Sequence, residues 1–122
     1  MVRRVEQSDI QEICTWFHSR NIKISSDYLS PTGFIVPGIA AGFLYLTNAN
    51  FVIFESFIGN PKKTHAERYK ALQEIVAEMI KEARILGFKR CFGFAVSQTM
   101  IRIGMEQGFE FVETCSTIKR DL

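Results

Sequence analysis

Two nearly continuous apolar runs lie in the middle of the chain, at residues 42–47 and 51–58. Both are rich in strand-forming residues, and Asn48-Ala49-Asn50 joins them. Because Asn tolerates left-handed backbone, a short connection of this kind predicts a hairpin. Neither run alternates apolar and polar residues, which is typical of strands that are covered on both faces. We therefore expect helices on both sides of a central sheet.

The strongest helical pattern follows this hairpin. Thr64 and Glu67 form a capping box, and apolar residues then recur with a 3.6-residue period until Gly87. Two shorter helices are predicted, one opened by Ser8 with Gln11 and ending near Arg20, and one running from Ser97 to Gly108.

Further strand patterns occupy residues 2–5, 34–36, 88–96 and 109–119. The chain has 122 residues, a length that suits one hydrophobic core, and no linker or repeat divides it. We predict a single domain over residues 1–122, of the α/β (α+β) class.

Charge and composition exclude several classes of partner. The net charge is +2, with 15 basic and 13 acidic residues scattered along the chain, so electrostatics predicts no nucleic-acid or acidic membrane partner. Pro37, Asn48, Asn50 and Glu55 interrupt the longest apolar region, which excludes a membrane helix there. The N-terminal residues lack the apolar stretch of a signal peptide, and we expect a cytoplasmic protein. The three cysteines show no metal-ligand spacing, so no metal site is predicted.

The order of these elements resembles the GNAT N-acetyltransferases along almost the whole chain. The closest local match covers residues 51–112. It consists of a strand ending at Ile58-Gly59-Asn60-Pro61, a long helix closing on Gly87-Phe88, and a helix from Ser97 to Gly108-Phe109. The resemblance implies a mixed central sheet of about six to seven strands with helices on both faces. It also implies transfer of an acetyl group from acetyl-CoA to an amine of a small molecule or a protein.

The resemblance implies a phosphate-binding turn at the start of the long helix. The family writes this turn Gln/Arg-x-x-Gly-x-Gly/Ala, whereas residues 63–71 contain no glycine. A helix N-terminus still offers free N–H groups and a positive dipole to a phosphate. The side chains implied to bind the cofactor here are Lys63, Arg68, Tyr69 and Lys70. Against this, Thr64 and Glu67 already use some of the amides, and the Glu67 carboxylate would repel a phosphate.

The pantetheine arm of the cofactor is implied to lie between two splayed strands. In this chain the backbone of Ser56, Phe57 and Ile58 would meet it, and one amide would polarise the thioester carbonyl. Gly59 and Asn60 suit a bulge or an irregular strand end. Ser97 stands where the family has an Asn that contacts the cofactor, although a plain N-cap is the alternative role.

Glu55 is the candidate catalytic base, because it is the only charge between residues 40 and 61 and lies on the strand that resembles the catalytic one. The alternative is a structural carboxylate paired with a nearby cation. The family's acid, a tyrosine in the last helix, is replaced by Gly104. Tyr45, Tyr28 or water would have to supply the proton, and a glycine is also what loss of catalysis would leave.

Two other hypotheses remain open from the sequence. One is a non-catalytic GNAT-like domain that acts as a protein-interaction or regulatory module, with a second copy or another protein as its partner. The other is an unrelated α+β ligand-sensing module. The acceptor amine is not identified, because residues 21–38, which would form its pocket, carry no recognisable chemistry.

Overall fold

The computed structural model describes all 122 residues, Met1–Leu122. Its single sheet has the order β1-β2-β3-β4-β5. The first four strands pair antiparallel, and β5 pairs parallel with β4. The mixed sheet is confirmed, but it has five strands rather than six or seven. The strands are β1 (Arg3–Arg4), β2 (Thr32–Val36), β3 (Ala40–Leu46), β4 (Phe51–Gly59) and β5 (Arg90–Gly93).

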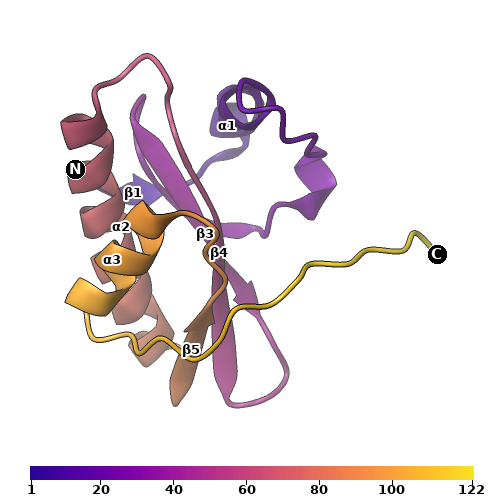
Figure 1. The fold of residues 1–122 in the computed structure, drawn as a ribbon, viewed down its shortest axis with the longest axis vertical. Helices are drawn as coiled ribbons and strands as arrows, with labels where there is room; N and C mark the ends of the chain where they lie inside the picture. The colour runs from indigo at the N-terminus through magenta and orange to yellow at the C-terminus, as the bar shows by residue number, and fades with distance from the viewer.

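Helices cover both faces of this sheet, as the apolar strands predict. Helix α1 (Ile10–His18) lies on one face, and α2 (His65–Ile85) and α3 (Gln98–Glu106) lie on the other (Figure 1). Two short 3-10 turns, η1 (Gln7–Asp9) and η2 (Ser26–Tyr28), flank α1 in the sequence. No helix is both long and apolar enough to cross a membrane.

The two faces carry separate hydrophobic cores of unequal size. The core under α2 and α3 has 13 buried residues, among them Phe54, Ile75 and Met79, whereas the core under α1 has 8, among them Trp16 and Phe43. Strand β4 supplies both cores, since Val52 and Phe54 face α2 and Ile58 faces α1. This explains why β4 reads as continuously apolar.

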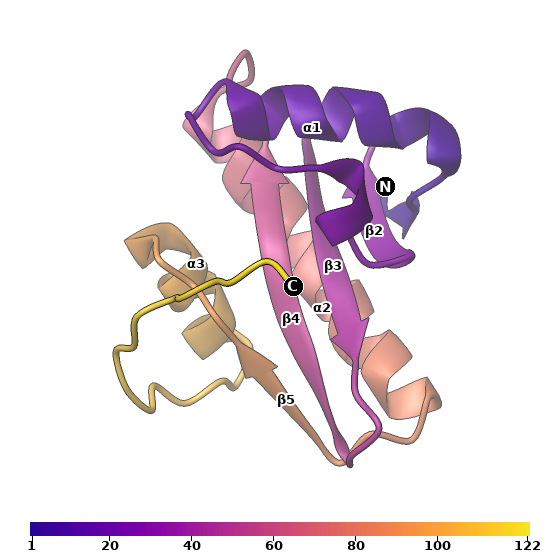
Figure 2. The ribbon, with the colours of Figure 1, turned by 90° about the vertical axis from the view of Figure 1, so that its right-hand side faces the viewer.

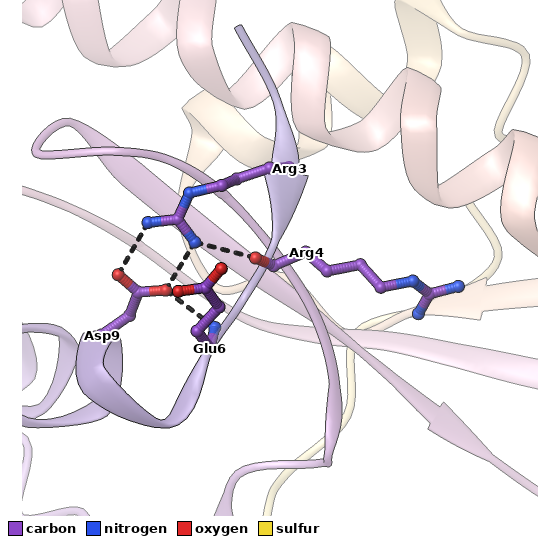
Figure 3. Close-up of polar contacts among 4 residues, drawn as sticks. All are labelled: Arg3, Arg4, Glu6 and Asp9. Atoms are coloured by element: carbon purple, nitrogen blue, oxygen red, sulfur yellow. Dashed lines mark hydrogen bonds and ion pairs between the residues drawn. The ribbon is translucent and has the colours of Figure 1, made fainter.

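The N-terminus is fastened by a charged cluster (Figure 3). The Arg3 guanidinium donates to both Asp9 carboxylate oxygens, at 2.7 and 3.0 Å, and the Glu6 amide donates to Asp9 Oδ2 at 2.7 Å. The hydrogen bonds from Arg3 hold the pKa of Asp9 below its ordinary value. The predicted capping box of Ser8 with Gln11 is wrong. The helical turn η1 already begins at Gln7, and its capping box joins Glu6 to Asp9, whose side chain accepts from the Glu6 amide.

The other two helix starts match their predictions. Thr64 and Glu67 form the capping box of α2, and Ser97 accepts from the Met100 amide at 3.1 Å as the N-cap of α3. Gly87 ends α2 with φ of 86°, a left-handed conformation that glycine adopts without strain.

The predicted final strand at residues 109–119 is wrong. Phe109 packs on Phe54, with ring centroids 5.6 Å apart, but no residue from 110 to 122 makes a backbone-to-backbone hydrogen bond. This C-terminal segment passes β5 and runs along the α1 side of the sheet, away from α2 (Figures 1 and 2). An alternating pattern defines a strand only where a neighbouring strand pairs with it, and this segment has none.

Candidate functional site

Strands β4 and β5 separate after a short paired region. They pair only between Phe51–Phe54 and Arg90–Gly93, and one further bond joins the Phe94 amide to the Phe54 carbonyl at 3.4 Å. Beyond this point β4 continues to Gly59 beside β3 alone, and Figure 2 shows the two strands diverging from their shared end. The edge of β4 that faces β5 is therefore without a strand partner over residues 55–59. Gly59 is buried and its carbonyl accepts from Arg20, so the part of this edge that is left for a ligand lies before Gly59.

A bulge in β4 lies at this point of separation. Glu55 is opposite Phe43 and Ile58 is opposite Ala41, so Ser56 and Phe57 together face Gly42. Ser56 has φ of 59°, one of two positive values among non-glycine residues. The bulge thus lies at Ser56 and Phe57, before the Gly59-Asn60 position expected from the sequence.

Gly42 is the residue that makes room for the bulge. A Cβ atom on Gly42 would lie 2.6 Å from the Phe57 ring, which packs across it toward α2. Any larger residue would push the ring, and the strand that carries it, out of place.

Because of the bulge, the Ser56 side chain reaches the α1 face of the sheet beside Tyr45. The two hydroxyl oxygens are 2.7 Å apart, and the Tyr45 hydroxyl is 3.0 Å from the Tyr28 carbonyl. A carbonyl only accepts, so Tyr45 donates its single proton to Tyr28 and accepts from Ser56. Burial raises the pKa of Tyr45, against the opposing effect of the Ser56 hydrogen bond.

Glu55 lies next to this hydroxyl cluster and is half-buried without a partner. None of the four salt bridges includes it, and burial raises its pKa with no hydrogen bond or cation opposing the shift. Its oxygens still reach solvent, because no fully buried side-chain oxygen or nitrogen lacks a hydrogen bond. The cation partner that a structural role for Glu55 requires is absent.

The start of α2 keeps two free amides. The Thr64 amide donates to Glu67 Oε1 and the Glu67 amide donates to Thr64 Oγ1, both at 3.1 Å. The hydrogen bond from the Thr64 amide is the main cause that lowers the pKa of Glu67. The amides of His65 and Ala66 have no acceptor and remain open to an anion.

The side chains predicted to bind cofactor do not all converge on this helix start. Arg68 folds back over Gly59 and donates to the Lys63 carbonyl, while Tyr69 turns toward α3 and donates to Glu106 Oε1 at 2.6 Å. Lys63 and Lys70 make no ion pair, which leaves both side chains free.

One cation near this end of β4 was missed by sequence reasoning. Arg20, just past α1, donates from Nη2 to the Gly59 carbonyl at 3.1 Å. No local motif marks Arg20, since the contact joins residues 39 positions apart.

The last helix contributes no hydroxyl to the site. Ser97 is engaged as an N-cap, and a Cβ atom on Gly104 would meet Phe109 at an ordinary 3.6 Å, so Gly104 is not required by close packing. The hydroxyls near Glu55 come instead from β3 and β4, as Tyr45 and Ser56. No three His, Cys, Asp or Glu side chains are grouped to hold a metal ion.

Comparison with known proteins supplies structural neighbours alone. No family model matches the sequence, and no curated protein matches it. A Trypanosoma brucei acetyltransferase superposes with a TM-score of 0.68 at 13% identity, covering 100% of this chain and 99% of that one. A Mycobacterium tuberculosis protein in complex with CoA and NLQ gives 0.73 at 16% identity, covering 97% and 76%.

A third neighbour is an aminoglycoside acetyltransferase from an uncultured soil metagenomic sample, in complex with sisomicin. It gives a TM-score of 0.69 at 11% identity, covering 100% of this chain and 95% of that one. At such low identities the likeness is one of fold. The chain therefore has a GNAT-like fold, which it shares with these neighbours.

Proposed function

We propose that the protein transfers an acetyl group from acetyl-CoA to an amine, with Glu55 as the catalytic base. One observation carries the proposal: a half-buried carboxylate without a cation stands where β4 leaves β5. Burying an unpaired carboxylate costs stability, and a role in the reaction is the simplest reason to keep it there.

The open edge of β4 is the proposed place for the pantetheine arm. The backbone of Ser56, Phe57 and Ile58 would pair with it as an added strand does, and one amide of the bulge would polarise the thioester carbonyl. Two structural neighbours of this fold were solved in complex with CoA, which supports CoA binding by this chain.

The phosphates would lie at the start of α2. The free amides of His65 and Ala66 and the side chains of Lys63 and Lys70 supply donors there. Arg68 would join them after leaving the loop carbonyls, and Tyr69 and Ser97 act as supports for α2 and α3.

The reaction follows from the groups on the α1 face. Glu55 takes a proton from the acceptor ammonium, directly or through water, and its raised pKa brings it closer to the neutral range in which a general base is most useful. The amine nitrogen then bonds to the thioester carbon, the carbon–sulfur bond breaks, and the nitrogen releases its second proton to water to give the amide. The thiolate takes its proton from water, because Tyr45 already donates to the Tyr28 carbonyl and its pKa is raised.

Calorimetric titration with acetyl-CoA, followed by transfer assays on a panel of amines, tests the proposal. Glu55→Gln should leave binding intact and lower kcat by about 10²- to 10⁴-fold. Glu78→Gln, a carboxylate on α2, is the matched control and should change neither. Absence of binding heat at millimolar acetyl-CoA would refute an acetyl-CoA enzyme.

The competing candidate is a non-catalytic domain of the same fold. Two observations favour it: Gly104 offers no acid, and the capping box uses two of the amides at the start of α2. The same titration discriminates the two, since a non-catalytic module has no need to bind acetyl-CoA.

A further inference from the structure

The C-terminal segment touches the candidate site through one side chain. Of residues 110–122, only Lys119 makes a hydrogen bond to the rest of the molecule, from Nζ to the Tyr28 hydroxyl at 3.4 Å. The same nitrogen lies 5.8 Å from the centroid of the Tyr28 ring, within range of a cation–π interaction. In Figures 1 and 2 this segment lies on the α1 side of the sheet, the face that carries the site.

Tyr28 belongs to a hydrogen-bond network that ends at Ser56, the residue after the candidate base. Its carbonyl accepts from Tyr45, Tyr45 accepts from Ser56, and Ser56 follows Glu55 in β4. An ammonium on the Tyr28 ring is therefore placed on the face toward which Glu55 points. The ring is half exposed, which leaves it accessible to a cation.

The geometry points to Tyr28 as an ammonium-binding subsite of the proposed acetyltransferase, with Lys119 of the same chain as an acetyl acceptor in cis. This inference rests on the proposed function and adds the class of acceptor: the primary amine of a lysine side chain. The Tyr28 ring attracts the ammonium, and Glu55 removes its proton.

The segment is free to deliver Lys119 to the thioester. It lies outside the sheet and the helices, so no backbone hydrogen bond opposes a shift along the sheet face. The deprotonated Lys119 nitrogen attacks the acetyl carbon, the carbon–sulfur bond breaks, and the nitrogen releases its second proton to water. The departing thiolate takes a proton from water and leaves as CoA. The product is an acetylated Lys119 without charge, which no longer binds the Tyr28 ring or Asp121.

Incubation of the full chain with acetyl-CoA, followed by peptide mass spectrometry over time, tests this inference. Lys119 should be acetylated at least about tenfold faster than Lys81, which lies in the last turns of α2, outside the proposed site. The rate per molecule should stay constant on dilution, because the acceptor is in the same chain. A rate proportional to protein concentration would refute acetylation in cis.

Substitutions at Tyr28 distinguish the contribution of its ring to the acetylation rate from that of its hydroxyl. Tyr28→Leu should slow Lys119 acetylation about two- to fivefold, whereas Tyr28→Phe keeps the ring and should keep most of the rate. Glu55→Gln should lower acetylation of Lys119 to the rate of Lys81. Because Tyr28 is half exposed, both of its variants should fold, which an unfolding curve verifies.

The two proposals fail in different ways. Acetyl-CoA binding and transfer to free amines, with Lys119 modified no faster than Lys81, would refute the Tyr28 subsite and leave the proposed function standing. Failure of acetyl-CoA to bind would refute both.

Discussion

The two strands beside β4, β3 and β5, pair with it over different lengths. Strand β3 follows it from Leu46 to Ala40 with one bulge, while β5 pairs with four of its residues and then departs. Buried side chains gather on the β3 side, whereas Phe92, Phe94 and Val96 beside the β5 junction are exposed. The β3–β4 pair thus stabilises the fold, and the β4–β5 pair leaves an opening. A sheet that is firm on one side of a strand can leave the other side to a ligand without unfolding.

The largest expected effect contrasts two phenylalanines across the β4–β5 pair. Phe54 is 1% exposed and Phe92 is 39% exposed. Phe54→Ala should cost about 3–5 kcal/mol of unfolding free energy through the cavity it leaves. Phe92→Ala removes an edge-to-face contact with the Phe51 ring, at 5.4 Å between centroids, and should cost about 1–2 kcal/mol. Urea denaturation of both variants measures the difference, and equal losses would show that β5 is as firmly packed as β4.

The next effect concerns the bulge that separates the two strand pairs. Gly42→Ala should destabilise by about 1–3 kcal/mol, because its Cβ atom meets the Phe57 ring. Phe57→Leu removes that ring, so the double variant should lose less than the sum of the single losses. Simple additivity in this double-mutant cycle would mean that Gly42 is not there to accommodate Phe57.

The sequence was sufficient to predict the elements that are determined by interactions between residues close in the chain. The β3–β4 hairpin, the capping box at Thr64 and the period of α2 all depend on residues close in the chain, and the structure has them. Strand β5 is shorter than residues 88–96, and residues 109–119 form no strand, because strand length depends on a partner. Periodicity carries no information about which partner is present.

The candidate site was predictable in part. Glu55 stands out as a lone charge in an apolar run, a signal that needs no structure. The contacts of Tyr45 with Ser56 and Tyr28 depend on the register of β3 against β4 and on a one-residue bulge, neither of which the sequence displays. A shift of one residue would have turned Ser56 to the opposite face.

A smaller effect is expected from a comparison of two N-caps, those of the helices that precede and follow β5 in the sequence, α2 and α3. Thr64→Ala and Ser97→Ala should each cost about 1 kcal/mol, since each removes one side-chain acceptor from a helix start. Only Thr64→Ala frees an amide, that of Glu67, at the proposed phosphate position. Calorimetry should therefore show tighter acetyl-CoA binding for Thr64→Ala and unchanged binding for Ser97→Ala. Equal affinities would place the phosphates elsewhere.

The smallest expected effect concerns Glu55, and it tests whether the Glu55 carboxylate lowers the unfolding free energy at neutral pH. Its folded pKa is raised by burial, so the folded state holds the proton more tightly than the unfolded chain does. The stabilising effect of that proton is fully present below the unfolded pKa and is lost as pH rises through the folded pKa. Glu55→Gln should therefore raise the unfolding free energy at pH 7, by up to about 1 kcal/mol after allowance for solvent screening.

This gain should disappear as the pH falls below 4.5, the ordinary value for Glu, where the wild-type carboxyl is also neutral. Thermal unfolding of both proteins at a series of pH values measures it. A loss of stability at pH 7 would instead indicate that Glu55 has a structural partner in solution. The predicted gain at pH 7 would show that the Glu55 carboxylate weakens the fold where β4 leaves β5, as expected of a group that serves the proposed proton transfer from an amine.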